Sequence, residues 1–269
     1  MGRLDGKVAF ITGGARGQGR AHAVRLASEG ADIITVDICG GFKTVKLAPA
    51  TPQELEETAR LVEKEGRRVV ARQADVRDLA GLQAALDEGV AELGRLDVVV
   101  ANAGILNAGW TWELTSEEWQ EVIDVNLTGV FNTAKAAIPT MIRQGQGGSI
   151  IMTSSVAGLY GQPFTAGYTA SKHGVVGLAR CLANELAEHS IRVNTIHPTG
   201  VDTEMYRVPD LFPLIQSKAE TLGPVFMNAL PAEVMQPEDI AAVVAFLASD
   251  ESRYMTGGQI RIDCGKLNR

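Results

Sequence analysis

Cysteine and aromatic residues are scarce in this chain of 269 residues. The three cysteines, Cys39, Cys181 and Cys264, are too few and too far apart for a disulfide framework or a cysteine-rich metal site. The four histidines lack the H-E-x-x-H spacing of a metal-binding helix, so we expect no bound metal. Aromatic residues make up only 5% of the chain, which argues against a surface that stacks nucleic-acid bases.

Long apolar runs and a positive net charge are missing as well. No run approaches the roughly 20 apolar residues that a membrane-spanning helix needs, and the N-terminal segment lacks the apolar core of a secretory signal. A net charge of −7 is a poor match for nucleic acid or an anionic membrane. We therefore expect a cytoplasmic protein that binds neither nucleic acid nor membrane.

Short apolar segments alternate with helix-length segments along the whole chain. The expected strands are residues 7–12, 31–36, 69–73, 96–101, 149–153, 191–196 and 259–262. Mostly apolar strands joined by helices predict a parallel sheet with helices on both faces. We find neither a repeat nor a linker. The expected fold class is α/β, a single-domain Rossmann-like doubly wound parallel sheet of about seven strands over residues 1–269.

Local signals mark several helix ends. Thr115 and Glu118 have the spacing of a capped helix start, and Pro237 is placed as the first residue of a helix. Gly30 and Gly66 follow helical patterns and are expected to stop them.

Two long segments interrupt this rhythm. Residues 38–51 follow the second expected strand without clear periodicity, and residues 202–236 separate the sixth strand from the last long helix. Loops of this length in a compact domain usually have a function. We expect residues 38–51 to be an insertion near a nucleotide and residues 202–236 to cover a substrate.

A glycine-rich turn directly follows the first expected strand. Gly13, Gly17 and Gly19 have the spacing G-x-x-x-G-x-G between a strand and a helix. Glycine lets the backbone approach a ligand closely, and a helix N-terminus offers free N–H groups to a pyrophosphate. The sequence therefore predicts a dinucleotide site, with a ligand-free turn as the alternative.

Asp37 follows the second strand at the distance expected for a ribose-binding acid. Its carboxylate can accept both adenosine ribose hydroxyls and would repel a 2′-phosphate, which favours NAD over NADP. Arg16, inside the glycine-rich turn, is a counter-signal because it could pair with such a phosphate. The alternative for Asp37 is a solvated turn residue.

Tyr168 and Lys172 are four residues apart in an expected helix, so their side chains share a face. An isolated tyrosine has a pKa of about 10, and a nearby ammonium favours the phenolate and lowers that pKa. Such a phenol can act as general base on an alcohol or as general acid on a ketone. The alternative is an exposed helix pair.

Two further polar residues support a reactive site. Ser155 lies at the end of a strand, where ligand-facing residues of open α/β sheets gather. By itself, a serine there is most often a turn or cap residue. Asn126 lies inside an otherwise apolar helical segment, and a buried amide needs partners. It marks either a structural bridge or a polar site.

The order of these motifs resembles the short-chain dehydrogenase/reductase family over nearly the whole chain. The segments that carry the resemblance are residues 12–19, Asp75-Val76, residues 102–104, Asn126, Ser155, Tyr168-x-x-x-Lys172 and residues 198–203. The resemblance implies an oxidoreductase that transfers hydride between a nicotinamide coenzyme and an alcohol or ketone. It also implies a homotetramer with the Tyr168-bearing helix at one interface.

The resemblance assigns roles to individual residues. Tyr168 would be the acid/base, Lys172 would lower its pKa and bind the nicotinamide ribose, Ser155 would orient the substrate oxygen, and Asn126 would hold a water in a proton relay. Together with the glycine-rich turn and Asp37, the expected coenzyme-binding residues are Gly13, Arg16, Gly17, Gln18, Gly19, Asp37, Asp75, Val76, Asn102, Ala103, Gly104, Tyr168, Lys172, Pro198, Val201 and Thr203.

Two departures from the family pattern indicate a particular branch of the family. Residues 197–200 read His-Pro-Thr-Gly where Pro-Gly is common, and residues 38–51 exceed the usual length. Both features resemble the carveol-dehydrogenase-like branch, which is linked to the redox carrier mycofactocin and is thought to hold NAD tightly. The insertion would then cover the adenosine end, and the alternative is an ordinary surface loop.

The expected substrate is a fairly apolar secondary alcohol or its ketone, and the resemblance suggests a terpenoid such as carveol. The side chains expected to line its pocket are Trp110, Trp112, Leu159, Phe164, Met205, Tyr206 and several residues up to Met227. Three alternatives stay open: a reductase of β-keto thioesters, a dehydrogenase of steroids or sugar alcohols, and a regulator that binds NAD without turnover.

Overall fold

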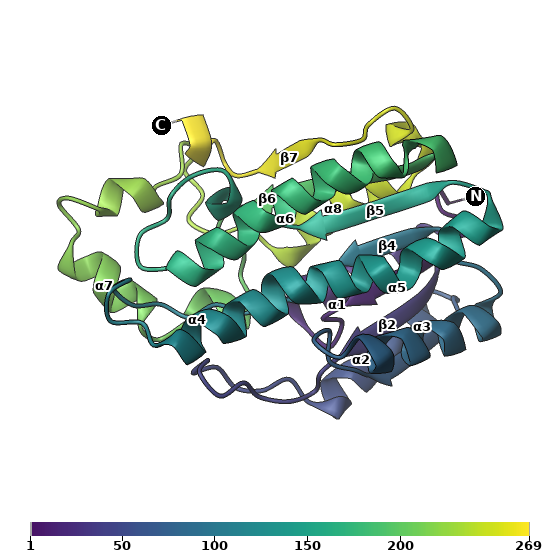
Figure 1. The fold of residues 1–269 in the computed structure, drawn as a ribbon, viewed down its shortest axis with the longest axis horizontal. Helices are drawn as coiled ribbons and strands as arrows, with labels where there is room; N and C mark the ends of the chain where they lie inside the picture. The colour runs from purple at the N-terminus through teal and green to yellow at the C-terminus, as the bar shows by residue number, and fades with distance from the viewer. Residues whose placement is uncertain (1, 269) are drawn as a thin grey trace.

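Seven parallel strands form one sheet in the computed structural model, which describes residues 2–268 (Figure 1). The strands are β1 (Val8–Thr12), β2 (Asp32–Asp37), β3 (Val69–Gln73), β4 (Val98–Ala101), β5 (Gly148–Thr153), β6 (Ile191–Pro198) and β7 (Gln259–Ile262). Their order is β3-β2-β1-β4-β5-β6-β7, and every neighbouring pair is parallel. The predicted fold class is confirmed.

Helices cover both faces of the sheet. One face carries α3 (Leu79–Leu93), α4 (Ser116–Ile123), α5 (Gly129–Gln144) and α6 (Ala166–Glu185), and the other carries α1 (Gly17–Ser28), α2 (Pro52–Lys64) and α8 (Pro237–Ala248). In β1, Phe10 packs into the first core, whereas Ala9 and Ile11 pack into the second. Burial on both sides explains why the strands are apolar throughout rather than alternating.

The predicted helix ends lie where the local signals placed them. The Thr115 side chain accepts from the backbone N–H of Glu118 at 3.1 Å, and the Glu118 carboxylate accepts from the N–H of Thr115 at 2.8 Å. Pro237 begins α8. Gly30 and Gly66 have φ of 104° and 74°, a left-handed backbone that glycine adopts readily.

The two irregular segments lie at the edge where the strands end (Figure 1). The loop 38–51 runs from β2 to α2, and residues 202–236 contain a 3₁₀ turn (Glu204–Arg207), the short helix α7 (Leu211–Ser217) and a second 3₁₀ turn (Gly223–Phe226). Helix α7 was not predicted, because a segment of seven residues that itself contains Pro213 carries too little periodicity to reveal it. An ion pair of 2.8 Å between Lys46 Nζ and Asp210 Oδ2 joins the two segments.

Candidate active site

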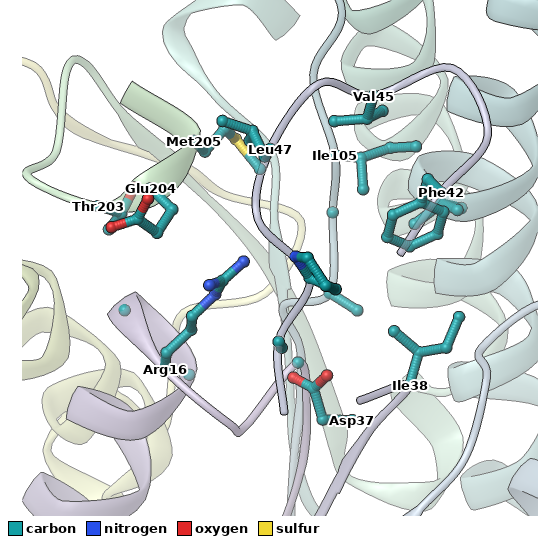
Figure 2. A pocket seen from close by; sticks show the side chains of 18 of the residues that line it. Arg16, Asp37, Ile38, Phe42, Val45, Leu47, Ile105, Thr203, Glu204 and Met205 are labelled. Atoms are coloured by element: carbon teal, nitrogen blue, oxygen red, sulfur yellow. The ribbon is translucent and has the colours of Figure 1, made fainter. Parts of the chain in front are cut away.

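A cavity of about 380 Å³ opens beside the carboxyl ends of β1, β2 and β4 (Figure 2). It lies where the strand order reverses between β1 and β4, the position at which open α/β sheets bind ligands. The predicted coenzyme-binding residues that line it are Gly13, Arg16, Gly17, Gln18, Gly19, Asp37, Asp75, Val76, Asn102, Ala103, Gly104 and Thr203.

The glycine-rich turn is too tight for side chains. A Cβ added to Gly19 would lie 1.9 Å from the backbone oxygen of Gly13, and one added to Gly13 would lie 2.9 Å from Cα of Ala103. Gly17 begins α1 with φ of 54°. Backbone N–H groups at the start of α1 therefore face the cavity at close range, a cradle that fits a pyrophosphate.

Asp37 is the last residue of β2 and is buried at the cavity wall. Its carboxylate accepts two backbone N–H bonds of 3.0 Å, one from Ala15 and one from Cys39. These bonds fix its direction, and an ionised carboxylate retains further lone pairs for hydroxyl donors. Asp37 is thus a positioned acceptor rather than a solvated turn residue.

Arg16 lines the same cavity but is engaged by the protein itself. Its guanidinium donates to the carbonyl oxygen of Ala48 at 2.6 Å and lies 3.8 Å from the carboxylate of Glu54. Both partners follow β2, in the loop 38–51 and the first turn of α2. The basic group therefore anchors the loop, which weakens it as a signal for a 2′-phosphate.

The loop 38–51 forms the outer wall of this cavity. Its residues Ile38, Phe42, Val45 and Leu47 line the hollow, with Val45 beside Ile105 and Leu47 beside Met205 in Figure 2. The carboxylate of Glu121 holds the loop from α4, because it accepts from the N–H of Lys43 at 3.1 Å and from the N–H of Thr44 at 2.8 Å.

Asp75 and Val76 line the far end of the cavity. The Asp75 carboxylate pairs with Arg77 at 2.6 Å, and the amide of Asn132 in α5 donates to the carbonyl oxygen of Val76 at 2.9 Å. After β4, the Asn102 amide donates to the carbonyl oxygen of Thr12 at 3.1 Å. Asn102 therefore braces the end of β1 with its side chain.

A second cavity, of about 190 Å³, adjoins the first and contains the predicted reactive groups. Ser155, Tyr168, Lys172, Pro198 and Val201 line it, and Gln18, Asn102, Gly104 and Thr203 line both cavities. All sixteen predicted coenzyme-binding residues therefore border one or both hollows.

Tyr168 and Lys172 share one face of α6, as their spacing predicts. Lys172 is 2% exposed, and its ammonium donates to the carbonyl oxygen of Thr153 at 2.8 Å. It lies 5.4 Å from the centroid of the Tyr168 ring. The Thr153 carbonyl fixes this position at the end of β5, next to Gly104, whose added Cβ would lie 3.6 Å from the ammonium nitrogen.

The pKa of Tyr168 differs from the sequence-based expectation. Burial raises the pKa of this phenol above its ordinary value, and the Ser155 hydroxyl opposes the rise only in part. Burial also lowers the pKa of Lys172 to about 8. The expectation of a lowered tyrosine pKa is wrong for the protein alone, because desolvation disfavours the charged phenolate more than the Ser155 hydroxyl stabilises it.

Ser155 occupies a braced position that sequence reasoning only partly anticipated. Its hydroxyl accepts from the N–H of Ala157 at 3.1 Å, so it also caps the 3₁₀ turn Val156–Gly158. The buried ring of His197 contacts the Ser155 carbonyl oxygen at 2.6 Å and the Thr195 hydroxyl at 2.7 Å. Burial lowers the pKa of His197 to about 4, so its neutral ring donates to that carbonyl near pH 7.

Asn126 lies in a π-helical turn (Asp124–Thr128) between α4 and α5. Its amide oxygen accepts from the N–H of Ile105 at 2.8 Å, and its amide nitrogen donates to the Ile105 carbonyl at 2.9 Å and the Ser171 hydroxyl at 3.3 Å. Such turns are frequent at functional sites. The side chain forms the structural bridge that the sequence left open.

The predicted substrate-lining residues divide into two groups. Met205 and Tyr206 line the 190 Å³ cavity, together with Phe226. Trp110, Trp112, Leu159, Phe164 and Met227 do not belong to its wall as the described residues define it. Trp110 stacks on Trp112 and meets Phe164 edge to face. Trp110 and Phe164 pack in one apolar cluster with the wall residue Leu106, whereas Trp112 is 75% exposed.

Sequence reasoning missed several polar residues of the second cavity. Gln162, Asn228 and Lys266 line it, although they are distant in sequence from the motifs. Asn228 accepts from the Thr199 hydroxyl at 3.1 Å and lies in the segment that was expected to cover the substrate. These residues offered no signal, because a single polar residue in a loop has no spacing to interpret.

Residues 2–268 contain neither a cluster of metal-binding side chains nor a membrane-spanning helix. In this part of the chain, three or more His, Cys, Asp or Glu residues never gather in positions that could hold a metal ion. Over the same range, each helix is too short or too polar to cross a bilayer.

Comparisons with known proteins agree with this geometry. The sequence model described as short chain dehydrogenase matches residues 7–209. The (-)-trans-carveol dehydrogenase of Rhodococcus erythropolis is 46% identical, with 98% of this chain and 99% of that protein covered. The crystal structure of carveol dehydrogenase from Mycobacterium avium in complex with NAD has a TM-score of 0.95 and 48% identity, with both chains covered completely. A short chain dehydrogenase from Mycobacterium paratuberculosis bound to NAD has a TM-score of 0.96 and 51% identity, again over 100% of each chain. This chain belongs to the short-chain dehydrogenase family.

Proposed function

We propose that this protein is an NAD-dependent oxidoreductase that interconverts a largely apolar secondary alcohol and its ketone. The observation that carries the proposal is that the larger cavity adjoins, along Gln18, Asn102, Gly104 and Thr203, a smaller cavity. Tyr168, Lys172 and Ser155 line that smaller cavity. One cavity begins at the glycine-rich turn and contains the Asp37 carboxylate, and the other is closed by residues 202–236. The relatives that bind NAD support this choice of coenzyme.

The residues of the larger cavity, together with Lys172, Pro198 and Val201 of the adjoining smaller one, fit NAD from one end to the other. Backbone N–H groups at the start of α1 would hold the pyrophosphate, and Asp37 would accept from the adenosine ribose hydroxyls. Asp75 and Val76 would border the adenine, and residues 102–104 would line the trough. Lys172 would bind the nicotinamide ribose, with Pro198, Val201 and Thr203 beside the carboxamide.

Proton transfer would be the task of the protein's own side chains. Bound NAD supplies the hydride acceptor and, in its oxidised form, a positive charge. Tyr168 would take the hydroxyl proton of an alcohol or return it to a ketone, while Ser155 holds the same oxygen. The Lys172 ammonium, 5.4 Å from the centroid of the Tyr168 ring, would favour the phenolate over the phenol. Asn126 would act as a positioning residue that holds the π-helical turn against residue 105.

The smaller cavity favours a compact apolar substrate. Its wall includes the apolar side chains of Leu106, Met205, Leu211, Phe212 and Ile215 beside the polar residues around Tyr168. Similarity to carveol dehydrogenases supports a cyclic terpenoid alcohol as one member of this class. The carboxylate of Asp37 disfavours the NADPH-dependent thioester reductase that the motifs also allow.

The loop 38–51 would slow the release of NAD. It walls the larger cavity and is tied down by Arg16, Glu121 and Asp210. A protein that keeps its NADH needs another oxidant, and a carrier such as mycofactocin would serve. Native mass spectrometry of protein purified without added nucleotide tests this role. Retained NAD is the expected result, and a nucleotide-free spectrum would contradict it.

Exposed aromatic side chains support a homotetramer. Trp119 in α4 is 40% exposed and Phe131 in α5 is 45% exposed, on the helix layer that contains α6. Light scattering after gel filtration tests the proposal, for which the expected mass is four times 28.6 kDa.

Turnover of cyclic secondary alcohols with NAD, with Tyr168→Phe beside the native protein, tests the proposed reaction. Loss of general acid–base catalysis should lower kcat by about 10²–10⁴-fold, while NAD still binds. Full activity of the variant would remove Tyr168 from the mechanism. A native protein that binds NAD and oxidises no alcohol would instead be a nucleotide-binding regulator.

A further inference from the structure

Lys266 is a cationic side chain in the wall of the 190 Å³ cavity. It begins the last 3₁₀ turn, Lys266–Asn268, just after β7. Only 8% of the residue is exposed, which is rare for lysine. Tyr168 and Ser155 line the same cavity, so a cation and the proposed reacting groups face one enclosed space.

The surroundings of Lys266 leave most of its hydrogen-bonding capacity unused. Its ammonium donates to the carbonyl oxygen of Phe226 at 3.4 Å, a long bond, and an ammonium has three donors. The centroids of the Phe226 and Tyr160 rings lie 5.4 and 5.6 Å from the nitrogen. Among the described residues Lys266 forms no ion pair. The nearby Asp263 carboxylate, which raises the pKa of Lys266 by its charge, accepts instead from the backbone N–H groups of Gly265 and Leu267.

Burying the charged Lys266 side chain in this site is unfavourable for the free energy of folding when no ligand is bound. Burial of a charge is unfavourable unless the charge is paired and hydrogen-bonded, and the two aromatic faces provide only part of that compensation. Burial lowers the pKa of Lys266 to about 8, so the ammonium is still largely protonated near pH 7. A buried, protonated and under-coordinated ammonium is suited to an anionic partner delivered by a ligand.

The cavity wall also contains the acidic residue Glu233, which is exposed, and two amide side chains that are already hydrogen-bonded within the protein. The Asn228 amide is engaged by Thr199 and by the carbonyl oxygen of Ala232 at 2.6 Å. The Gln162 amide oxygen accepts from the Tyr160 hydroxyl at 3.0 Å. Lys266 is therefore the cationic group of the cavity wall that is available to a ligand beyond Lys172, whose ammonium is already bonded to the Thr153 carbonyl.

We infer that Lys266 binds a carboxylate at the end of the substrate remote from the reacting carbon. The substrate class is then a hydroxy acid or its oxo acid, with an apolar, preferably cyclic, body between the two oxygen functions. The apolar side chains of the same cavity wall, among them Leu106, Leu211 and Ile215, can contact this apolar part of the substrate. This inference rests on the proposed function, since it names the substrate class of the same site.

The test compares two alcohols that differ only in charge at the remote end. 4-Hydroxycyclohexanecarboxylate and 4-methylcyclohexanol are each oxidised with NAD by the native protein, Lys266→Met and Lys266→Arg. We expect the native kcat/KM to favour the hydroxy acid by about tenfold or more, the size of a hydrogen bond to a charged group. Lys266→Met should abolish that preference through KM, and Lys266→Arg should retain much of it.

A matched control and a binding measurement complete the design. Lys64→Met removes an exposed lysine from the end of α2 and should leave the preference intact. Binding of cyclohexanecarboxylate to the NAD-loaded protein is followed by calorimetry, which needs no turnover. Native protein that binds it at least tenfold more tightly than Lys266→Met supports the site, and equal binding by the two proteins, or none by either, overturns it.

The possible outcomes distinguish failure of this inference from failure of the proposed reaction on which it rests. Oxidation of 4-methylcyclohexanol without any preference for the hydroxy acid, and without a change in Lys266→Met, would overturn the inference and leave the proposed reaction standing. If neither alcohol is oxidised, the proposed reaction fails for these probes and the calorimetry alone decides whether Lys266 binds carboxylates. Retained NAD binding shows that each variant is folded.

Discussion

The two cavities are built from different parts of the chain in different ways. The larger one has the backbone turn of Gly13, Gly17 and Gly19 on one side and the loop 38–51, which directly follows β2, as its outer wall. The smaller one is walled by long side chains from segments far apart in sequence, such as Met205, Phe226 and Lys266. A coenzyme that never varies can be held by backbone, whereas the substrate is selected by side chains that loops deliver. Substitutions should therefore affect the two functions separately.

The largest effect is expected from Gly19→Ala in the backbone-built cavity. The added methyl would lie 1.9 Å from the Gly13 oxygen, so the turn must open. Overpacking of this kind costs up to about 3 kcal/mol or more, and NAD affinity should fall roughly 100-fold. Fluorescence titration with NADH measures it.

Gly177→Ala is the matched control for this change. Gly177 lies in α6, and a Cβ there meets no atom within 4 Å among the described residues. The substitution should raise stability by about 0.5–1 kcal/mol, as expected for an open helical site, and leave NADH affinity unchanged. Equal losses in both variants would show that the turn is not a steric cradle.

A smaller effect is expected from Asp37→Ala, which removes the main charge of the coenzyme cavity. Loss of charged hydrogen bonds to a ribose should weaken NAD binding about tenfold and relax the rejection of NADP. The ratio of kcat/KM for the two coenzymes measures this shift. A native protein that prefers NADP would contradict the role of this carboxylate.

Glu121→Gln tests whether the loop 38–51 retains the coenzyme. The Glu121 carboxylate accepts three hydrogen bonds, two from the backbone N–H groups of Lys43 and Thr44 and one from the Thr44 hydroxyl. A neutral amide cannot accept them all equally well, so NADH should dissociate several-fold faster, which stopped-flow fluorescence measures. Glu117→Gln is the control, because the exposed Glu117 lies 3.7 Å from Lys43 at the surface and should change nothing.

The last predicted effect is on the free energy of unfolding, and it comes from Lys266 in the smaller cavity. Burial lowers the pKa of Lys266 from 10.5 to about 8, so the unfolded chain binds more protons between these values and the folded state is penalised below pH 8. Lys266→Met should therefore stabilise the protein by about 1–3 kcal/mol at pH 7. The gain should shrink as the pH rises from 8 toward 10.5.

Urea unfolding at several pH values measures this gain, with Lys64→Met as the exposed control. A gain that does not change with pH would mean that packing, rather than the buried charge, separates the two proteins.

The contrast between the two cavities also explains which features of the fold and the site could be predicted from the sequence. The ends of β1, β2 and β5 were predictable because apolar runs stop at Thr12, Asp37 and Ser155, and parallel strands bring such ends to one edge. The helical spacing of Tyr168 and Lys172 likewise determined their common face. These predictions depend on backbone geometry that short sequence patterns specify.

Other features depend on packing between distant segments. The ring of His197 beneath Ser155 and the ammonium of Lys266 in the cavity wall had no local signal, because contacts across the fold place them there. The direction of the pKa shift of Tyr168 was wrong because its burial depends on segments beyond its own helix. Trp110 and Trp112 were assigned to the pocket as apolar residues near the ends of the strands. The fold instead places Trp112 at the surface and Trp110 in the apolar cluster that contains Phe164.

The central claim is that carbon-bound hydrogen passes directly from a substrate in the smaller cavity to a coenzyme in the larger one. The most direct measurement uses a cyclic secondary alcohol deuterated at its carbinol carbon, with NAD and the native protein, and determines the mass of the reduced coenzyme. Direct transfer predicts NADH that carries one deuterium, formed far more slowly by Tyr168→Phe. Unlabelled NADH, or labelled NADH formed equally fast by both proteins, would contradict the claim.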